Sequence, residues 1–156
     1  MVFHVVAVGR VRDAGLNAAC ADYVGRIRRY AKLEIHEVPD GTRRSKSREG
    51  VLREEAAALG KAIPRAARLV ALSRGGRQLD SRGFAAALDG WRQAGRDLAF
   101  LVGGAYGLDE ALQGRCDEVI RVSDMTLPHE LARLVLLEQI YRGNTILKGE
   151  PYHKGV

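Results

Sequence analysis

The chain has 156 residues, a size typical of one domain that buries about two-thirds of the surface exposed by its unfolded chain. Its hydrophobic content of 46% and charged content of 28% are those of an ordinary soluble globular protein, and no apolar run approaches the roughly 20 residues of a membrane span. The formal net charge of +6 favours a polyanionic partner, which is a statement about association and not about fold.

The N-terminus has an apolar stretch but lacks the basic region and cleavage site of a signal peptide. The two cysteines, Cys20 and Cys116, lie far apart, so we interpret both as buried thiols of a reducing cytoplasm and not as a disulfide or a metal pair. These observations predict a cytoplasmic protein without a membrane segment.

The first part of the chain alternates between strand-like and helix-like patterns. We expect a strand over 2–8, a helix over 16–32, a second strand over 33–38 and a helix over 49–63. His36 lies in the second strand, and we interpret it as a surface or cross-strand residue and not as a ligand.

A basic loop follows the turn at Pro39-Asp40-Gly41. It carries four cations in the seven residues 42–48, among them Arg43, Arg44 and Lys46. Such a loop suits contact with a phosphate backbone, although a plain solvated loop has the same composition.

The second part continues the alternation. We expect a strand over 69–73, a turn over 74–77, a helix from Asp80-Ser81 to Gly95, a strand over 98–102, a short helix from Asp109, a strand over 118–122 and a helix over 128–146. Trp91 falls on the inner face of its helix and is expected in the core. The whole pattern predicts one α/β domain over 1–156, with a mainly parallel sheet and helices on both faces.

The last helix and the tail differ from ordinary terminal segments. The run 134–137 makes the helix apolar on nearly all sides, which favours a subunit interface. The tail 148–156 places Tyr152, His153 and Lys154 together, an unusual composition for a terminus that simply frays.

Two expected strands end in special loops. The strand 98–102 runs into Gly103-Gly104, and the strand 118–122 runs into the segment 123–127. Because ligands of parallel sheets bind at the carboxyl ends of the strands, both loops are expected to face one small molecule. On spacing alone, the glycine segment is equally consistent with a plain tight turn.

Several familiar motifs do not match. The glycine segment lacks the spacing of the dinucleotide fingerprint and the Lys-Ser/Thr of a P-loop, which argues against a dehydrogenase-like nucleotide enzyme. Arg133 stands where a zinc protease helix beginning at His129 needs its second histidine, and no Cys/His group has metal-ligand spacing. We therefore expect no metal.

Three stretches together resemble one known family. They are LVGGAYGL at 101–108, VSDMTLPHELARL at 122–134 and PYHK at 151–154, and VVAVGR at 5–10 fits as well. The pattern is similar to the ribosomal RNA large-subunit methyltransferase H family of the SPOUT class, and the resemblance covers the whole chain.

The resemblance implies a SPOUT fold whose C-terminal part forms a trefoil knot, S-adenosylmethionine as the methyl donor, and a homodimer. The implied reaction is methylation at N3 of a pseudouridine in a stem-loop of large-subunit (23S) ribosomal RNA, within the ribosome. The implied cofactor residues are Leu72, Gly103, Val122, Ser123, Asp124, Met125, Thr126 and Leu127, and Gly104 is added by adjacency. Asp124 is expected to point its side chain away from the cofactor or to contact it through the backbone.

Such a reaction needs a group that removes the N3 proton or stabilises the resulting anion. His153 and His129 are the candidate bases, and Arg142 or Lys154 could stabilise the anion. Candidate RNA contacts are Arg43, Arg44, Lys46, Tyr152 and Lys154. The alternative function is a non-catalytic basic RNA-binding module.

Overall fold

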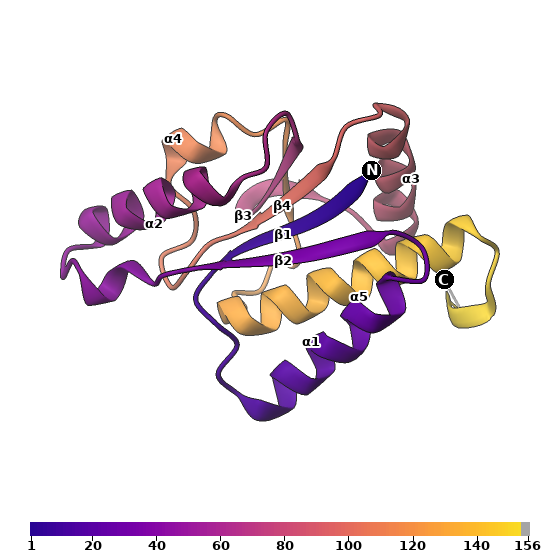
Figure 1. Ribbon diagram of the computed structural model, residues 1–156, viewed down its shortest axis with the longest axis horizontal. Coiled ribbons are helices and arrows are strands. Elements are labelled where there is room, and N and C mark those ends of the chain that lie inside the picture. Colours follow the sequence, from indigo (N-terminus) through magenta and orange to yellow (C-terminus); the bar gives the residue numbers. More distant parts are fainter. Residues whose placement is uncertain (154–156) are drawn as a thin grey trace.

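A five-stranded sheet, with every strand parallel, forms the centre of the molecule (Figure 1). This computed structural model describes residues 1–153, without the side chain of His153. The strands are β1 (Val2–Val8), β2 (Lys32–Val38), β3 (Arg68–Gln78), β4 (Leu98–Val102) and β5 (Glu118–Arg121), in the spatial order β2-β1-β4-β3-β5. The predicted α/β fold with a parallel sheet is confirmed.

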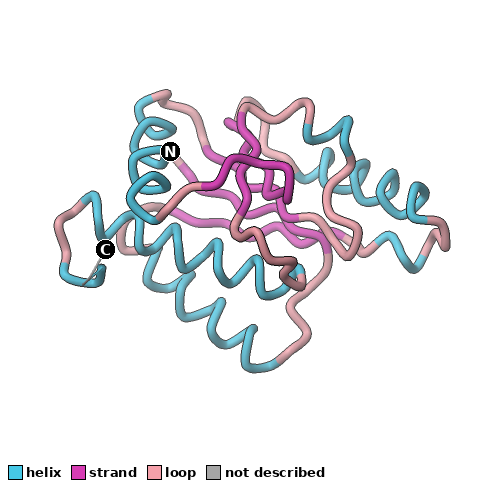
Figure 2. Tube along the Cα trace, turned by 180° about the vertical axis from the view of Figure 1, so that it is seen from behind, coloured by secondary structure: helices cyan, strands magenta, loops and turns pink. Residues whose placement is uncertain are grey.

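Helices cover both faces of the sheet (Figure 2). One face carries α1 (Ala14–Ile27), α3 (Ser81–Gln93) and α5 (His129–Leu147), and the other carries α2 (Arg48–Ala62) and α4 (Glu110–Gln113). Two short 3-10 helices, η1 (Gly41–Arg43) and η2 (Pro151–His153), complete the described chain. Within residues 1–153, no helix has both the length and the apolar character needed to cross a membrane.

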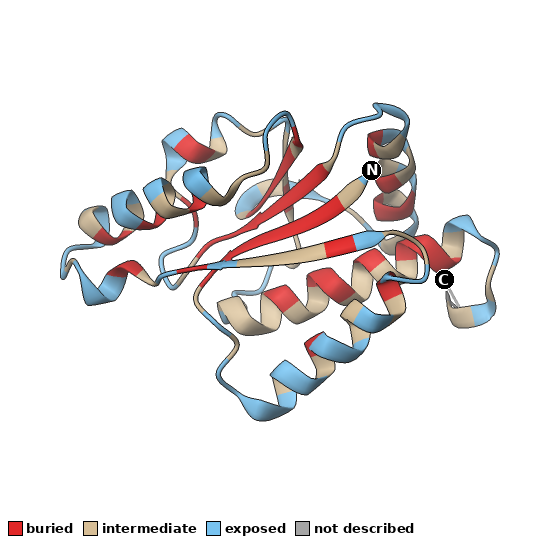
Figure 3. Cartoon of the chain, in the orientation of Figure 1, coloured by how far each residue is buried: buried red, intermediate tan, exposed pale blue. Residues whose placement is uncertain are grey.

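The central strands β1 and β4 are buried on both faces, as the red strands of Figure 3 show. Phe3 and Val5 of β1 pack toward α1 and α5, whereas the alternate residue Val6 packs toward α2. A strand buried on both faces needs a continuous apolar run, and this is the pattern of the sequence at both strands.

The local signals for helix α3 and its surroundings are confirmed. Asp80 caps α3 by accepting a 2.6 Å hydrogen bond from the Gly83 backbone N–H, and Gly95 follows the helix with φ of +68°. Trp91 is buried in the core, where its ring meets Phe100 edge-on at 5.9 Å. Cys20 and Cys116 are both free thiols. Burial is confirmed for Cys20 but is wrong for Cys116, which is only half-buried after α4, where its thiol donates a hydrogen bond to the Leu112 carbonyl.

The predicted helix over 16–32 is wrong at its C-terminal end. Helix α1 ends at Ile27, and Lys32 already pairs with Val2 at the start of β2. Between them, the Tyr30 hydroxyl donates a short hydrogen bond to Glu150 near the C-terminus. Tertiary contacts therefore override a helical pattern that continues in the sequence.

The predicted turn over 74–77 is also wrong, because β3 continues through it to Gln78. Strand β3 pairs with β5 twice, so that Ile120 is the partner of both Leu72 and Arg77. At Gly76, an added Cβ would lie 2.4 Å from the carbonyl carbon of Ile120. The backbone of β3 thus passes directly against β5. The trefoil knot that the family resemblance implies for the C-terminal part stays a prediction.

We expect Gly76→Ala to destabilise the protein by about 1–3 kcal/mol, the usual cost of overpacking, because the clash is with the backbone of β5. The matched control is Gly75→Ala, since a Cβ at Gly75 meets nothing within 4 Å. The measurement is the free energy of unfolding from urea titration. Equal stability of the two variants would contradict the close approach.

Candidate functional site

Loops that follow β3, β4 and β5 line one cleft of about 1420 Å³ at the carboxyl edge of the sheet. The N-terminal part of α2 forms a further wall. The lining includes eight of the nine predicted cofactor residues: Leu72, Gly103, Gly104, Val122, Ser123, Met125, Thr126 and Leu127. Leu72 and Val122, which are 50 positions apart in the sequence, thereby lie on the wall of the same cleft.

The glycine segment after β4 forms a tight turn that closes on itself. The Gly107 backbone N–H donates a 3.1 Å hydrogen bond to the Gly104 carbonyl, and Gly107 has φ of +81°. A Cβ on Gly103 would lie 2.3 Å from the carbonyl carbon of Gly107, so only glycine fits there. The turn presents backbone to the cleft, and Tyr106 at its tip is exposed.

A buried carboxylate lies directly behind this turn. Glu55 of α2 is only 2% exposed and accepts a 3.1 Å hydrogen bond from the Gly41 backbone N–H. A Cβ on Gly104 would lie 2.8 Å from one Glu55 oxygen and 2.9 Å from the other. Burial raises the pKa of Glu55, and the hydrogen bond from Gly41 opposes this shift. Glu55 therefore connects the basic loop after β2 with the glycine turn.

The loop after β5 carries the other predicted cofactor residues. The Ser123 hydroxyl oxygen accepts a 3.0 Å hydrogen bond from the Met125 backbone N–H, which shapes the loop. Asp124 is the predicted cofactor residue absent from the cleft lining, and its carboxylate forms a 2.9 Å ion pair with Arg121. Met125 lines the cleft with 77% of its surface exposed, unusual for a large apolar residue.

The next wall is the start of α5, where His129 lines the cleft. One helical turn later, the buried Arg133 forms a 2.6 Å ion pair with Glu37 and donates hydrogen bonds to the carbonyls of Val8 (3.2 Å) and Gly9 (2.7 Å). These bonds fix the beginning of α5 to the carboxyl ends of β1 and β2. The position of His129 follows from them.

Arg142, the second predicted catalytic residue on α5, lies toward the C-terminal end of that helix. Arg142 donates hydrogen bonds of 2.9 and 2.6 Å to Glu138, and its guanidinium lies 4.8 Å from the centre of the Tyr152 ring. The hydroxyls of Tyr152 and Tyr23 share a 3.1 Å hydrogen bond. Burial, together with that bond, raises the pKa of Tyr152, which keeps its hydroxyl protonated.

The structure therefore separates the predicted catalytic residues into two groups. His129 and Arg142 are 13 positions apart on one helix, which corresponds to about 20 Å at 1.5 Å per residue. Tyr152 belongs to the distant group, while the predicted His153 side chain and Lys154 lie outside the described residues. Among the described residues of the tail, 148–152 are absent from the lining of the chain's own cleft.

Basic residues surround the cleft more closely than the sequence suggested. The predicted Arg43, Arg44 and Lys46 are exposed on the loop after β2 but are not among the lining residues. Four other arginines do line the cleft: Arg48, Arg53, Arg74 and Arg121. Arg48 is the last cation of the predicted basic loop and begins α2, whereas Arg53 lies within α2, where the helical pattern gave no sign that it would face a cleft.

A comparison with protein-family models matches residues 1–153 to a family described as "Predicted SPOUT methyltransferase". The match spans the sheet, the glycine turn, the loop after β5 and all of α5. The fold and the cleft thus belong to a methyltransferase of the SPOUT class.

Curated relatives give a narrower assignment. The chain is 44% identical over 154 residues to the ribosomal RNA large subunit methyltransferase H of Anaeromyxobacter sp. (strain Fw109-5), covering 99% of this chain and 100% of the relative. Proteins of the same name from Gemmatimonas aurantiaca and Dechloromonas aromatica (strain RCB) are 42% and 40% identical, with coverage of 96% and 99% of this chain and 97% and 99% of the relatives. The chain belongs to the ribosomal RNA large subunit methyltransferase H family.

The buried Glu55 gives a prediction about pH. Its folded pKa lies above the unfolded value of about 4.3, so the folded protein binds the proton more tightly. The tighter proton binding by Glu55 stabilises the folded protein below about pH 4.3, and this stabilisation is lost as the pH rises through the folded pKa. Glutamine does not titrate, so the Glu55→Gln variant does not lose stability in this way.

We therefore expect the Glu55→Gln variant to gain stability relative to the wild type as the pH rises from about 4 to 8. Unfolding titrations at several pH values measure the difference. Glu54→Gln is the matched control, because Glu54 is the exposed neighbour on the same helix. If the stability difference between Glu55→Gln and the wild type changed as little with pH as that of the control, the burial argument would be contradicted.

Proposed function

We propose that the protein transfers a methyl group from S-adenosylmethionine to N3 of a pseudouridine in a stem-loop of large-subunit (23S) ribosomal RNA. The observation that carries this proposal is the convergence of the loops after β3, β4 and β5 on one cleft. The family supports the reaction class and the RNA, and the cleft supports a bound small molecule next to a basic surface.

The residues of the cleft fit the methyl donor. The turn 103–107 lines the cleft with three glycines, so a ligand can approach the main chain closely there. Met125 and Tyr106 offer exposed apolar surface for the uncharged parts of the donor. When bound, S-adenosylmethionine supplies an electrophilic methyl group on a sulfonium, so no enzyme nucleophile is required.

The protein's own contribution is then orientation and proton removal. Correct alignment of two reactants accounts for roughly 7–11 kcal/mol of a barrier in favourable cases. The N3 nitrogen must lose its proton, and a positioned base contributes about 10²–10⁴-fold. In this proposal the candidate proton acceptors are His129, at the cleft, and His153, from the tail. Arg142 or Lys154 stabilises the pseudouridine anion that forms when N3 loses its proton.

Charge supports an RNA substrate. Four arginines line the cleft, and the exposed Arg43, Arg44 and Lys46 add further positive charge on the loop after β2. Contacts of this kind bind the phosphate backbone and position the nucleic acid without reading its sequence. Selection of one nucleotide then depends on the shape of the cleft and of the stem-loop.

Geometry supports a homodimer in which the tail completes the partner's site. The described part of the tail, up to the short helix η2, follows the C-terminal end of α5, away from the first turn of that helix (Figure 1). There Tyr152 contacts Tyr141 edge-on, with ring centres 4.6 Å apart. A tail that takes part in catalysis must therefore reach the cleft of a second chain. The partly exposed Leu134 and Val135 of α5 are available for the contact between the two chains.

We expect calorimetric titration to give one S-adenosylmethionine site per chain. Gly103→Ala should lose at least about tenfold in affinity, because its Cβ would displace the turn at Gly107. Asp124→Ala should stay within about twofold, since that carboxylate faces Arg121. Circular dichroism checks that both variants are folded. No heat of binding to the wild type would favour the non-catalytic RNA-binding module.

Deletion of residues 151–156 should abolish methyl transfer while donor binding persists. The measurement is mass spectrometry of large-subunit RNA from cells that lack the protein and are complemented with the wild type or the truncated chain. Mixed dimers provide the control: a truncated chain paired with a Gly103→Ala chain should recover one working site. Full activity of the truncated homodimer would refute the role of the tail.

A further inference from the structure

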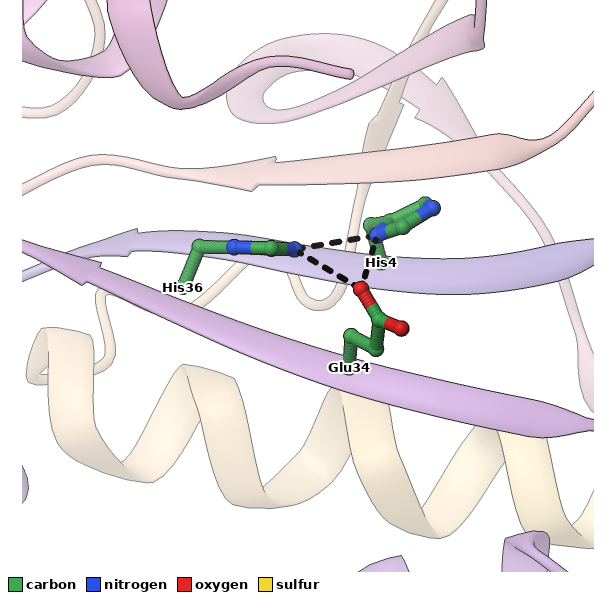
Figure 4. Close-up of side chains that lie close together, drawn as sticks. All are labelled: His4, Glu34 and His36. Carbon is green, nitrogen blue, oxygen red and sulfur yellow. Dashed lines mark hydrogen bonds and ion pairs between the residues drawn. The ribbon is translucent and has the colours of Figure 1, made fainter.

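A second group of chemically reactive side chains lies on β1 and β2, away from the cleft. His4 of β1 stands opposite Glu34 of β2 in the register, and His36 lies two residues further along β2, on the same face (Figure 4). The three side chains point toward one another. His4 and Glu34 are the third residues of β1 and β2 and His36 is the fifth residue of β2, whereas the cleft is lined by loops at the carboxyl ends of β3, β4 and β5.

The distances between the donor atoms suit a metal ion. His4 Nδ1 is 3.0 Å from His36 Nε2 and 3.6 Å from a carboxylate oxygen of Glu34, and the His36 nitrogen is 3.8 Å from that oxygen. A tetrahedral zinc ion with bonds of about 2.0–2.1 Å separates its ligand atoms by about 3.3–3.4 Å. The three donors already have nearly this spacing before any ion is present.

A further carboxylate lies behind His4, as is usual behind metal-bound imidazoles. His4 Nε2 is buried without a hydrogen-bond partner among the described residues, and Asp97 Oδ2 is 3.8 Å from it. The other Asp97 oxygen accepts a 2.7 Å hydrogen bond from the Val2 backbone N–H. With Nδ1 on a metal, the proton of His4 resides on Nε2 and faces Asp97, which fixes the tautomer.

The surroundings allow an ion to enter and to keep an open position. His4 is 5% exposed, whereas the side chains of Glu34 and His36 are 38% and 33% exposed. Lys32 binds the second Glu34 oxygen at 2.7 Å and so leaves the first directed at the histidines. Three protein ligands and one water would complete a four-coordinate site.

We propose that His4, Glu34 and His36 form a binding site for a divalent transition-metal ion of the zinc class. The ion joins the edge strand β2 to the central strand β1 and leaves one coordination position for water. Two imidazoles and one carboxylate are donors that such ions prefer over magnesium or calcium. The interpretation of His36 as a surface or cross-strand residue agrees with its 3.0 Å contact to His4 across the two strands. The proposal adds a ligand role, which the sequence did not indicate because His4 is 32 positions away.

The competing explanation is a simple hydrogen bond between two neutral imidazoles, with Glu34 nearby by chance. That explanation accounts for the 3.0 Å distance between the two rings but predicts no binding of an ion. Titration of the untagged full-length protein with Zn²⁺, followed by competition with a chromophoric chelator, separates the two. We expect one ion per chain, and Co²⁺ in its place should give the absorption of a tetrahedral site.

Variants assign the ligands. His36→Gln and Glu34→Gln should each weaken Zn²⁺ binding at least about tenfold, and Asp97→Asn should weaken it by about 10–100-fold, as for other carboxylates behind a ligand. His129→Gln is the matched control, because it removes a histidine from the opposite end of the sheet and should leave Zn²⁺ affinity unchanged.

Thermal unfolding gives a second readout, since an ion that binds only the folded chain raises the melting temperature. The rise with Zn²⁺ should appear in the wild type and in His129→Gln, and should vanish in His36→Gln. Absence of one-to-one binding by the wild type, or equal affinity of the wild type and His36→Gln, would overturn the proposal.

Discussion

The arrangement of the cleft depends on the buried guanidinium of Arg133. This side chain is only 2% exposed, and its contacts join three elements: Glu37 of β2, the carbonyls of Val8 and Gly9 after β1, and the first turns of α5. A buried charge is tolerated only when its partners are in place, and removal of one partner typically costs about 3–5 kcal/mol. The helix can therefore begin in only one position. The loop 122–128, which leads into it, is held between that position and the end of β5.

Helix α5 carries a different part of the proposed chemistry at each end. Its first turn places His129 in the cleft, and its last turns hold the tail through Glu138, Arg142 and Tyr152. His129 and Arg142 are separated by 13 positions of a rigid helix, about 20 Å, so the two residues do not meet at one site within a single chain. In our proposal the length of this helix is the reason for a dimer. Two copies bring the end of one helix to the beginning of the other's cleft.

Much of the fold could be predicted because its signals are local. Apolar runs mark β1 and β4, Asp80 and Gly95 mark the ends of α3, and the glycine pair marks the turn after β4. The errors have a common cause, because each depends on contacts between distant segments. The second pairing of β3 needs β5 beside Gly76, the early end of α1 needs Val2, and the buried Glu55 needs the backbone of Gly41 and Gly104. No periodicity within one segment records such partners, and the same holds for His4 and His36.

Strand β1 links the two sites that this molecule offers. Near its amino end, His4 faces Glu34 and His36 of β2. At its carboxyl end, the carbonyls of Val8 and the following Gly9 accept hydrogen bonds from Arg133, which also binds Glu37 of β2. The same two neighbouring strands thus supply the proposed metal ligands and the partners of the residue that positions α5. An ion at His4 would restrain the pairing of β1 with β2, and this pairing sets the distance between Val8 and Glu37. Because Arg133 must reach both, the proposed metal site and the start of α5 share one structural constraint although they lie at opposite ends of the sheet.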